Sequence, residues 1–252
     1  MRKNSVIRSL RRPLAALAIL VTGALALSGC LYAQIPAREA DGPCVSEPSA
    51  ATDVAGDLQP FYEQRIEWAD CGNGMETATV TAPLDWNDPS AGEIELALVR
   101  QPATGGEALG SLLVNPGGPG ASGYDFIAQS VDFAVSERLQ EQYDIVGFDP
   151  RGVGRSTPVT CLDAAAMDQY LYAIPEHERG TPEWEAELAA DNTEFAEACE
   201  QNSGGILEYI TTEQSARDMD LLRGVLGDEQ LSYLGYSYGT FLGATYAELF
   251  PD

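Results

Sequence analysis

The chain has 252 residues, 44% of them hydrophobic and 21% charged, which is enough apolar sequence for one large domain or two small ones. This composition excludes wholesale disorder, and no repeat of about 20–50 residues recurs, so solenoids and propellers are excluded too. The chain carries 39 acidic against 14 basic residues, a net charge of −25. Nucleic acid repels such an acidic body, and we expect no nucleic-acid partner.

The first residues are typical of an export signal. Residues 1–29 hold five basic residues and no acidic one, so without them the net charge is −30. The apolar run Leu14–Leu27 is shorter than the roughly 20 residues that a bilayer span needs. The Leu-Ser-Gly-Cys that ends at Cys30 resembles a bacterial lipobox. We predict a lipoprotein signal peptide over residues 1–29, lipid on Cys30, and a place outside the cytoplasm at the cell membrane, reached through this anchor only. The alternative is an ordinary secreted protein.

Four further cysteines would then lie in an oxidising compartment, which favours disulfides. They allow three pairings, and we predict the two that close local loops, Cys44–Cys71 and Cys161–Cys199; the alternative is buried free thiols. The sequence has no Cys-x-x-Cys pair and no His-rich cluster. It therefore predicts no metal site and no cofactor.

The remaining chain divides into a tether and a folded body. Residues 30–59 lack apolar periodicity and predict a flexible tether, whereas residues 60–252 have a globular pattern. Thr77–Ala82 and Glu93–Val99 alternate apolar and polar residues, as half-buried strands at one end of a sheet do. Between them, Asp88–Gly92 predicts a turn.

Farther along, short apolar strands alternate with helical patterns, which predicts an α/β protein with a mostly parallel sheet. The predicted strands are Ser111–Val114, Tyr143–Phe148 and Leu231–Leu234, and the predicted helices are 124–142, the segment capped by Thr212 and ended by Gly227, and Thr240–Leu249. Residues 157–210 interrupt this alternation with two helices, the second beginning at Thr181-Pro182. We expect this acidic segment, tied by Cys161–Cys199, to be an insertion above the sheet and a candidate lid.

The strongest motif is Gly-Tyr-Ser-Tyr-Gly at 235–239, between a predicted strand and a predicted helix. In that context G-x-S-x-G is a nucleophile elbow, and its tight turn exposes the hydroxyl of Ser237 at the edge of the sheet.

A glycine-rich loop, Asn115–Gly123, follows the predicted strand Ser111–Val114. In the fold that carries such an elbow, this loop supplies one backbone N–H of an oxyanion hole, and the residue after the nucleophile supplies the other. Gly117, Gly118 and Tyr238 are the candidates. A third loop, Asp149–Ser156, holds one carboxylate and two arginines, and we interpret it as structural.

Taken in order, NPGGPGASG, YDIVGFDPRGVGRS, TTEQSARDMDLLRGVLG and YLGYSYGTFLGATYAELFPD resemble secreted bacterial α/β-hydrolases of the tripeptidyl aminopeptidase type, which are similar to proline iminopeptidase. The resemblance covers about residues 61–252. It implies that Ser237 is the nucleophile of a Ser–Asp–His triad that releases short peptides from free N-termini or hydrolyses esters. Proline iminopeptidases begin the oxyanion loop with His where this chain has Asn115. Many members also have a second Cys shortly after the position of Cys71, where this chain has Glu76-Thr77.

The rest of the triad is not in place. In this fold the acid and the base follow the nucleophile along the chain, but only Glu248 and Asp252 are acidic after Ser237, and no histidine follows it. The single histidine, His177, lies in the insertion, where we expect an exposed residue. We therefore expect the N-terminal part of a longer enzyme, truncated after the helix of the elbow and inactive alone. The alternatives are a non-catalytic peptide-binding surface lipoprotein and a carboxylesterase; the substrate is a peptide or an ester.

Overall fold

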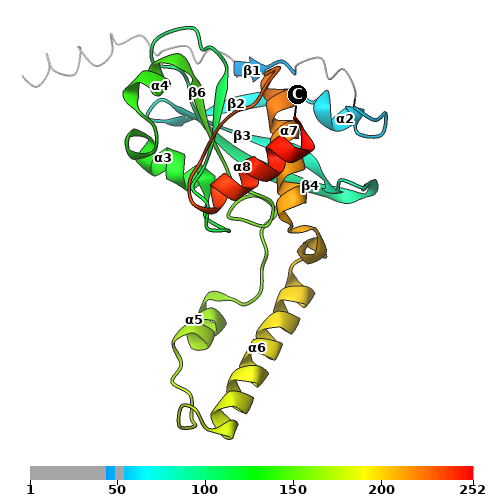
Figure 1. The fold of residues 1–252 in the computed structure, drawn as a ribbon, viewed down its shortest axis with the longest axis vertical. Helices are drawn as coiled ribbons and strands as arrows, with labels where there is room; N and C mark the ends of the chain where they lie inside the picture. Colours follow the sequence, from blue (N-terminus) through cyan, green and yellow to red (C-terminus); the bar gives the residue numbers. More distant parts are fainter. Residues whose placement is uncertain (1–43, 49–53, 252) are drawn as a thin grey trace, which may run out of the picture. The chain divides into compact units, whose positions relative to one another are not determined.

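A seven-stranded sheet organises residues 44–48 and 54–251, the part of the chain that the computed structural model describes (Figure 1). The sheet order is β1-β2-β3-β4-β6-β5-β7. The strands are β1 (Cys44–Ser46), β2 (Ile66–Gly72), β3 (Met75–Asp85), β4 (Asp88–Gln101), β5 (Ser111–Asn115), β6 (Asp144–Phe148) and β7 (Ser232–Gly235). The helices are α2 (Gln59–Tyr62), α3 (Gly123–Ala134), α4 (Glu137–Gln142), α5 (Ala164–Tyr172), α6 (Pro182–Asn202), the 3₁₀ turn η1 (Ile206–Tyr209), α7 (Thr212–Leu226) and α8 (Tyr238–Leu249).

The sheet is mixed, and its parallel part is the one that the apolar strands predicted. β5 pairs in parallel with β6 on one side and with β7 on the other. The other pairs are antiparallel: β1 with β2, β2 with β3, β3 with β4, and β4 with β6. Leu112, Val114 and Ile145 pack with α3 on one face. Leu113 and Val146 pack on the other face, which α7 and α8 cover. Both faces of β5 and β6 are therefore buried, and the predicted α/β class is confirmed.

The two strands predicted by alternation lie within β3 and β4, but the predicted turn at residues 88–92 is wrong. β4 begins at Asp88, which pairs with Asp85, and the chain reverses at Trp86-Asn87. Trp86 is buried, and its backbone N–H donates to Gln214 Oε1 at 3.0 Å. A contact with the distant helix α7 thus fixes the position of the reversal.

The helix predicted over residues 124–142 is two helices, α3 and α4. Between them Val135 is extended (φ −135°, ψ 132°) and 2% exposed. Its carbonyl accepts from Gln140 Nε2 at 2.8 Å, so a side chain of the second helix stabilises the break. The other helices lie close to their predicted positions: Thr211 rather than Thr212 caps α7, Gly227 ends it in the left-handed region, and α8 begins at Tyr238.

The predicted tether extends too far along the chain. Residues 44–46 form β1 at the edge of the sheet, where Ser46 Oγ accepts from Trp68 Nε1 at 2.8 Å. Val54 and Leu58 pack against the core. The rest of the predicted tether, residues 30–43 and 49–53, lies outside the described residues.

The two predicted disulfides have different outcomes. The Cys161–Cys199 bond is formed, with S–S 2.05 Å, and ties the ends of the insertion. Cys71 is a free, exposed thiol, so the predicted Cys44–Cys71 bond is wrong. The strand register gives the reason: Cys44 lies opposite Trp68, and three residues along a strand is about 10 Å, beyond the Cα separation of about 7 Å that a disulfide spans.

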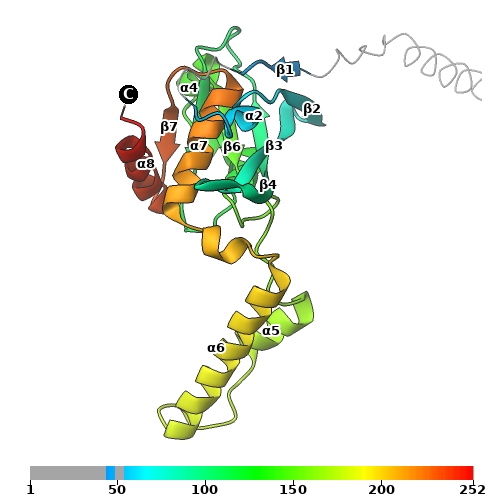
Figure 2. The ribbon, with the colours of Figure 1, turned by 90° about the vertical axis from the view of Figure 1, so that its right-hand side faces the viewer.

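The insertion forms the two predicted helices, α5 and α6, which lie side by side in both views (Figures 1 and 2). The Tyr170 ring stacks on the Phe195 ring with their centroids 4.4 Å apart. No residue of α5 is buried, and Cys199 is the buried residue of α6. The fold thus holds this segment mainly through its ends, at the disulfide.

A buried ion pair joins the loop after β6 to α7. The Arg151 guanidinium, fully buried, donates from Nε and Nη2 to the two oxygens of Asp218 at 2.7 and 2.6 Å. Nη1 also donates to the carbonyls of Leu84 and Tyr209, at 2.8 and 3.3 Å. Burial raises the pKa of the Asp218 carboxyl, and the Arg151 charge opposes that shift. One guanidinium therefore connects the β3–β4 hairpin, the end of the insertion and α7.

Replacing Arg151 by methionine should lower the free energy of unfolding of the full-length protein by about 3–5 kcal/mol, because Asp218 is left buried without its partner. In this variant, protonation of Asp218 removes the unpaired buried charge. The loss of unfolding free energy should therefore become smaller as the pH falls toward the pKa of the unfolded carboxyl, about 4. The matched control is Arg65→Met, which removes the exposed Arg65–Glu47 pair and should cost at most about 1 kcal/mol. Urea unfolding at several pH values measures the unfolding free energy of both variants. Equal small losses in the two variants would show that the buried pair stabilises the fold no more than the exposed pair does.

Candidate active site

Ser237 lies at the turn between β7 and α8, as the motif predicted. Its backbone has φ 51° and ψ −122°, a conformation that side chains rarely adopt, and its side chain is exposed. The turn is crowded: a Cβ at Gly235 would lie 2.5 Å from the carbonyl oxygen of Gly239. Such strain at an exposed hydroxyl is what a nucleophile elbow requires. Among the described residues, Ser237 Oγ has no hydrogen-bond partner.

The oxyanion loop, Asn115–Ser122, meets this elbow directly. Asn115, the last residue of β5, lies opposite Gly235 in the parallel pairing, and its carbonyl accepts from Tyr236 N at 2.9 Å. A Cβ built on Gly117 would lie 2.9 Å from Tyr238 N and 3.0 Å from Ser237 Cβ. The structure thus packs the oxyanion loop, at Gly117, closely against the predicted nucleophile and the backbone of Tyr238.

The three predicted oxyanion residues do not have the same role. The N–H of Gly117 donates to Asn115 Oδ1 at 2.8 Å, so in this structure it is not free to bind an oxyanion. The N–H groups of Gly118 and Tyr238 have no hydrogen-bond partner among the described residues. Tyr238 is also the first residue of α8, where the helix dipole favours negative charge. These two groups are the candidate oxyanion donors.

The far end of the oxyanion loop is held by the loop after β6. Ser122 caps α3, accepting from Asp125 N at 2.9 Å, and its hydroxyl donates to the buried Asp149. Asp149 also accepts from Arg155 N at 2.9 Å, and the Arg155 guanidinium pairs with Asp125 at 3.0 Å. The structural role predicted for the Asp149–Ser156 loop is confirmed, although its other arginine, Arg151, pairs with Asp218, a partner that the sequence did not indicate.

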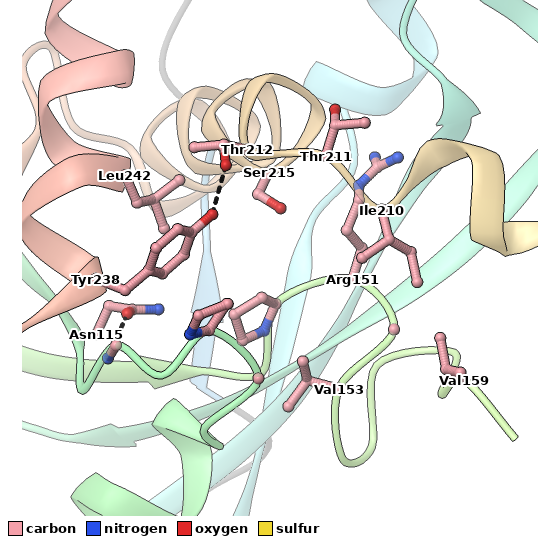
Figure 3. A pocket seen from close by; sticks show the side chains of 15 residues that line it. Asn115, Arg151, Val153, Val159, Ile210, Thr211, Thr212, Ser215, Tyr238 and Leu242 are labelled. Carbon is pink, nitrogen blue, oxygen red and sulfur yellow. Dashed lines mark hydrogen bonds between the residues drawn. The ribbon is translucent and has the colours of Figure 1, made fainter. Parts of the chain in front are cut away.

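A pocket of about 450 Å³ adjoins Tyr238 and the oxyanion loop (Figure 3). One wall contains the Tyr238 hydroxyl, which shares a hydrogen bond with Thr212 Oγ1 at 2.5 Å. Arg151 is the charged residue of the described lining, and it is paired; no carboxylate belongs to that part of the lining. The lining is Asn115, Gly117, Pro119, Gly120, Pro150–Val153, Val159, Ile210–Thr212, Ser215, Tyr238 and Leu242. Such a site suits an uncharged group of a substrate.

A tyrosine on β7 fixes the elbow from the core side. The Tyr233 hydroxyl donates to the carbonyl of Gly239 at 2.9 Å. Burial raises the pKa of Tyr233 above its ordinary value, so the hydroxyl stays protonated and remains a donor throughout the physiological range. The position of Ser237 is therefore supported by neutral hydrogen bonds that do not change with pH.

Two predicted residues do not join this site in the structure. His177 is half-exposed in the insertion, and its Nδ1 lies 2.9 Å from Glu187 Oε2. That environment matches the exposed residue that we expected. Cys30 lies outside the described residues. Within the described ranges, no helix combines the length and the apolar character of a membrane span.

A sequence model of the alpha/beta hydrolase fold matches residues 110–252, which contain the oxyanion loop and the elbow. The chain belongs to the α/β-hydrolase family. Over 227 residues it is 40% identical to the tripeptidyl aminopeptidase of Streptomyces lividans, covering 85% of this chain and 39% of that protein. The resemblance that the four motifs carried is confirmed by this match.

Two further relatives come from Mycobacterium tuberculosis H37Rv. The serine protease Hip1 is 37% identical over 204 residues, 77% of this chain and 39% of that protein. Carboxylesterase B is 38% identical over 149 residues, 58% of this chain and 28% of that protein. The chain thus spans about two fifths or less of the length of these relatives.

Two glycines of the oxyanion loop make a matched test of the hydrolase site. Gly117 and Gly120 have nearly the same φ, 94° and 92°, but only Gly117 faces the elbow, while nothing lies within 4 Å of a Cβ on Gly120. In the full-length protein, Gly117→Ala should slow labelling of Ser237 by a fluorophosphonate about 10²-fold or more, because its Cβ displaces the donors. Gly120→Ala should slow labelling less than about tenfold. Its backbone strain of about 1–2 kcal/mol should lower mainly the stability of the fold. Equal effects would mean that close packing at Gly117 is unimportant.

Proposed function

We propose that Ser237 is the nucleophile of an exported serine peptidase that releases short peptides from free N-termini. The observation that carries this proposal is the strained, exposed Ser237, which is followed by the unpaired Tyr238 N–H and packed against Gly117 of the oxyanion loop. The similarity to a tripeptidyl aminopeptidase and to a serine protease supports peptides as substrates.

The geometry gives each group one task. Ser237 Oγ attacks the scissile carbonyl carbon while a base takes its proton, and the carbonyl oxygen becomes an oxyanion. Gly118 N–H and Tyr238 N–H donate to that oxyanion in a site that needs no rearrangement. The tetrahedral intermediate then collapses: its C–N bond breaks, and the leaving amine takes the proton from the base. Water attacks the acyl-enzyme in the same way, with the base taking its proton, and the acyl–Oγ bond breaks as Ser237 recovers a proton. The uncharged pocket beside Tyr238 would hold the acyl part of the substrate.

We further propose that the orienting acid and the base come from sequence outside these 252 residues. The single histidine is His177, which is half-exposed and paired with Glu187. A serine without its base is a weak nucleophile, so these 252 residues alone would be nearly inactive. The coverage of about two fifths of the tripeptidyl aminopeptidase is consistent with a contribution from further chain.

Anchoring is a separate proposal that rests on the sequence pattern. We propose that Cys30 receives a diacylglycerol after removal of residues 1–29, which would hold the acidic body at the membrane surface. In cells fed an alkyne-tagged fatty acid, the full-length protein should carry the label and stay with the membrane. Cys30→Ser should abolish both; a labelled Cys30→Ser protein would contradict the proposal.

An esterase is the second candidate function, favoured by the 38% identity to carboxylesterase B. A panel of tripeptidyl, single aminoacyl and simple ester substrates on the full-length protein separates the two. Free tripeptidyl substrates should be hydrolysed fastest, Ser237→Ala should reduce turnover by about 10⁴-fold or more, and the 252-residue chain should show only background. Faster turnover of esters or of blocked N-termini would reject the aminopeptidase.

The exposed Ser90→Ala, in the β3–β4 hairpin, is the matched serine control and should leave turnover unchanged. Turnover that persists in Ser237→Ala would reject the assignment of the nucleophile.

A further inference from the structure

Among the residues that the structure describes, Asn115 alone hydrogen-bonds to both the oxyanion loop and the elbow. Its backbone carbonyl accepts from Tyr236 N at 2.9 Å, and its side-chain Oδ1 accepts from Gly117 N at 2.8 Å. Tyr236 precedes the nucleophile, and Gly117 precedes the candidate donor Gly118. Asn115 is 1% exposed, so neither bond competes with solvent.

The Asn115 amide also packs against the elbow. A Cβ on Gly239 would lie 2.9 Å from Asn115 O and 3.0 Å from Asn115 Oδ1. Figure 3 shows the side chain of Asn115 beside Tyr238, with a dashed bond on its oxygen side. The side chain is thus confined between the loop and the elbow, and a buried amide in one orientation is a rigid acceptor.

The hydrogen bond to Gly117 decides which loop N–H is available. Gly117 has φ 94° and Gly118 has φ 111°, backbone conformations that glycine adopts readily and other residues rarely do. Because Asn115 Oδ1 engages the N–H of Gly117, the loop is held with the N–H of Gly118 left unpaired. Without the acceptor, the Gly117 N–H is a buried donor without a partner, and the loop gains by turning to satisfy it.

We propose that Asn115 is a positioning residue of the oxyanion hole: its side-chain oxygen fixes the loop so that Gly118 N–H and Tyr238 N–H point to the same oxyanion. The proposal rests on the proposed function of Ser237. Asn115 touches no reacting atom in this account, and its effect acts through the two donors. Misplacing one donor should lower the rate of the chemical step and leave binding of the substrate's remaining groups unchanged.

The test compares Asn115→Thr with Asn115→Val in the full-length protein. The two side chains have nearly the same shape, but only threonine offers an oxygen that can accept from the N–H two residues on. We expect Asn115→Val to lower kcat about 10²-fold with KM within about twofold, and Asn115→Thr to recover kcat to within about tenfold of wild type. The fluorophosphonate labelling rate of Ser237 should fall in parallel with kcat.

Controls separate positioning from stability. Asn87→Ala removes an exposed asparagine in the β3–β4 hairpin and should leave kcat and KM unchanged. Thermal unfolding of each variant shows whether the assay temperature lies well below its midpoint. If Asn115→Val does not fold, Asn115→Ala and Asn115→Ser provide the same comparison with smaller side chains.

Equal kcat values for Asn115→Val and Asn115→Thr would overturn the inference, as would a change confined to KM. If wild type and Ser237→Ala hydrolyse every substrate at the same rate, the proposed function itself fails, and the inference fails with it. A wild-type enzyme that depends on Ser237 but ignores the Asn115 substitutions would leave the proposed function intact and reject only the positioning role.

Discussion

The parallel pairing of β5 with β7 is the constraint on which the site depends. It places Asn115 opposite Gly235, so two segments separated by about 120 residues in sequence end at the same edge of the sheet. Each strand then leads directly into its functional segment, the oxyanion loop or the elbow. β5 is buried on both faces, and β7 packs partly against the core through Tyr233 on one face and Leu234 on the other. This packing and the pairing fix the register, so the loop and the elbow are held together.

Close packing of backbone atoms holds the oxyanion loop against the nucleophile elbow. Gly117 lies against Tyr236, Ser237 and Tyr238, where a side chain would not fit, and Asn115 bonds to both segments. The hydrogen bonds at the elbow itself, from Asn115 and Tyr233, involve neutral groups, whereas Asp149 holds the far end of the oxyanion loop. The buried charges, Arg151 and Asp218, lie behind this layer and tie the β3–β4 hairpin and the insertion to α7.

Local patterns predicted the features that depend on local structure. The elbow at Ser237, the buried strands around Val114 and Val146, and the second helix of the insertion at Thr181 all follow from nearby residues. The family followed from four such patterns in order. The segments of the site could be predicted one by one, because the residues of each motif favour the turn that the motif forms.

The errors concern contacts between distant residues. Nothing near Cys44 indicates that it pairs with Trp68, and this register rules out a bond to Cys71. The reversal at Trp86 depends on Gln214, more than 100 residues away, and the partner of Arg151 lies on α7. The engagement of Gly117 by Asn115 was missed although the two are only two residues apart, because a glycine-rich loop does not reveal which N–H it leaves free.

The most direct test is the structure of the full-length protein after Ser237 has reacted with a fluorophosphonate. The phosphoryl oxygen of that adduct occupies the place of the oxyanion. Our account predicts that it lies about 2.7–3.1 Å from both Gly118 N and Tyr238 N, with Gly117 N still bonded to Asn115 Oδ1. An oxygen bound by other groups, or by Gly117 N in place of Gly118 N, would contradict the account.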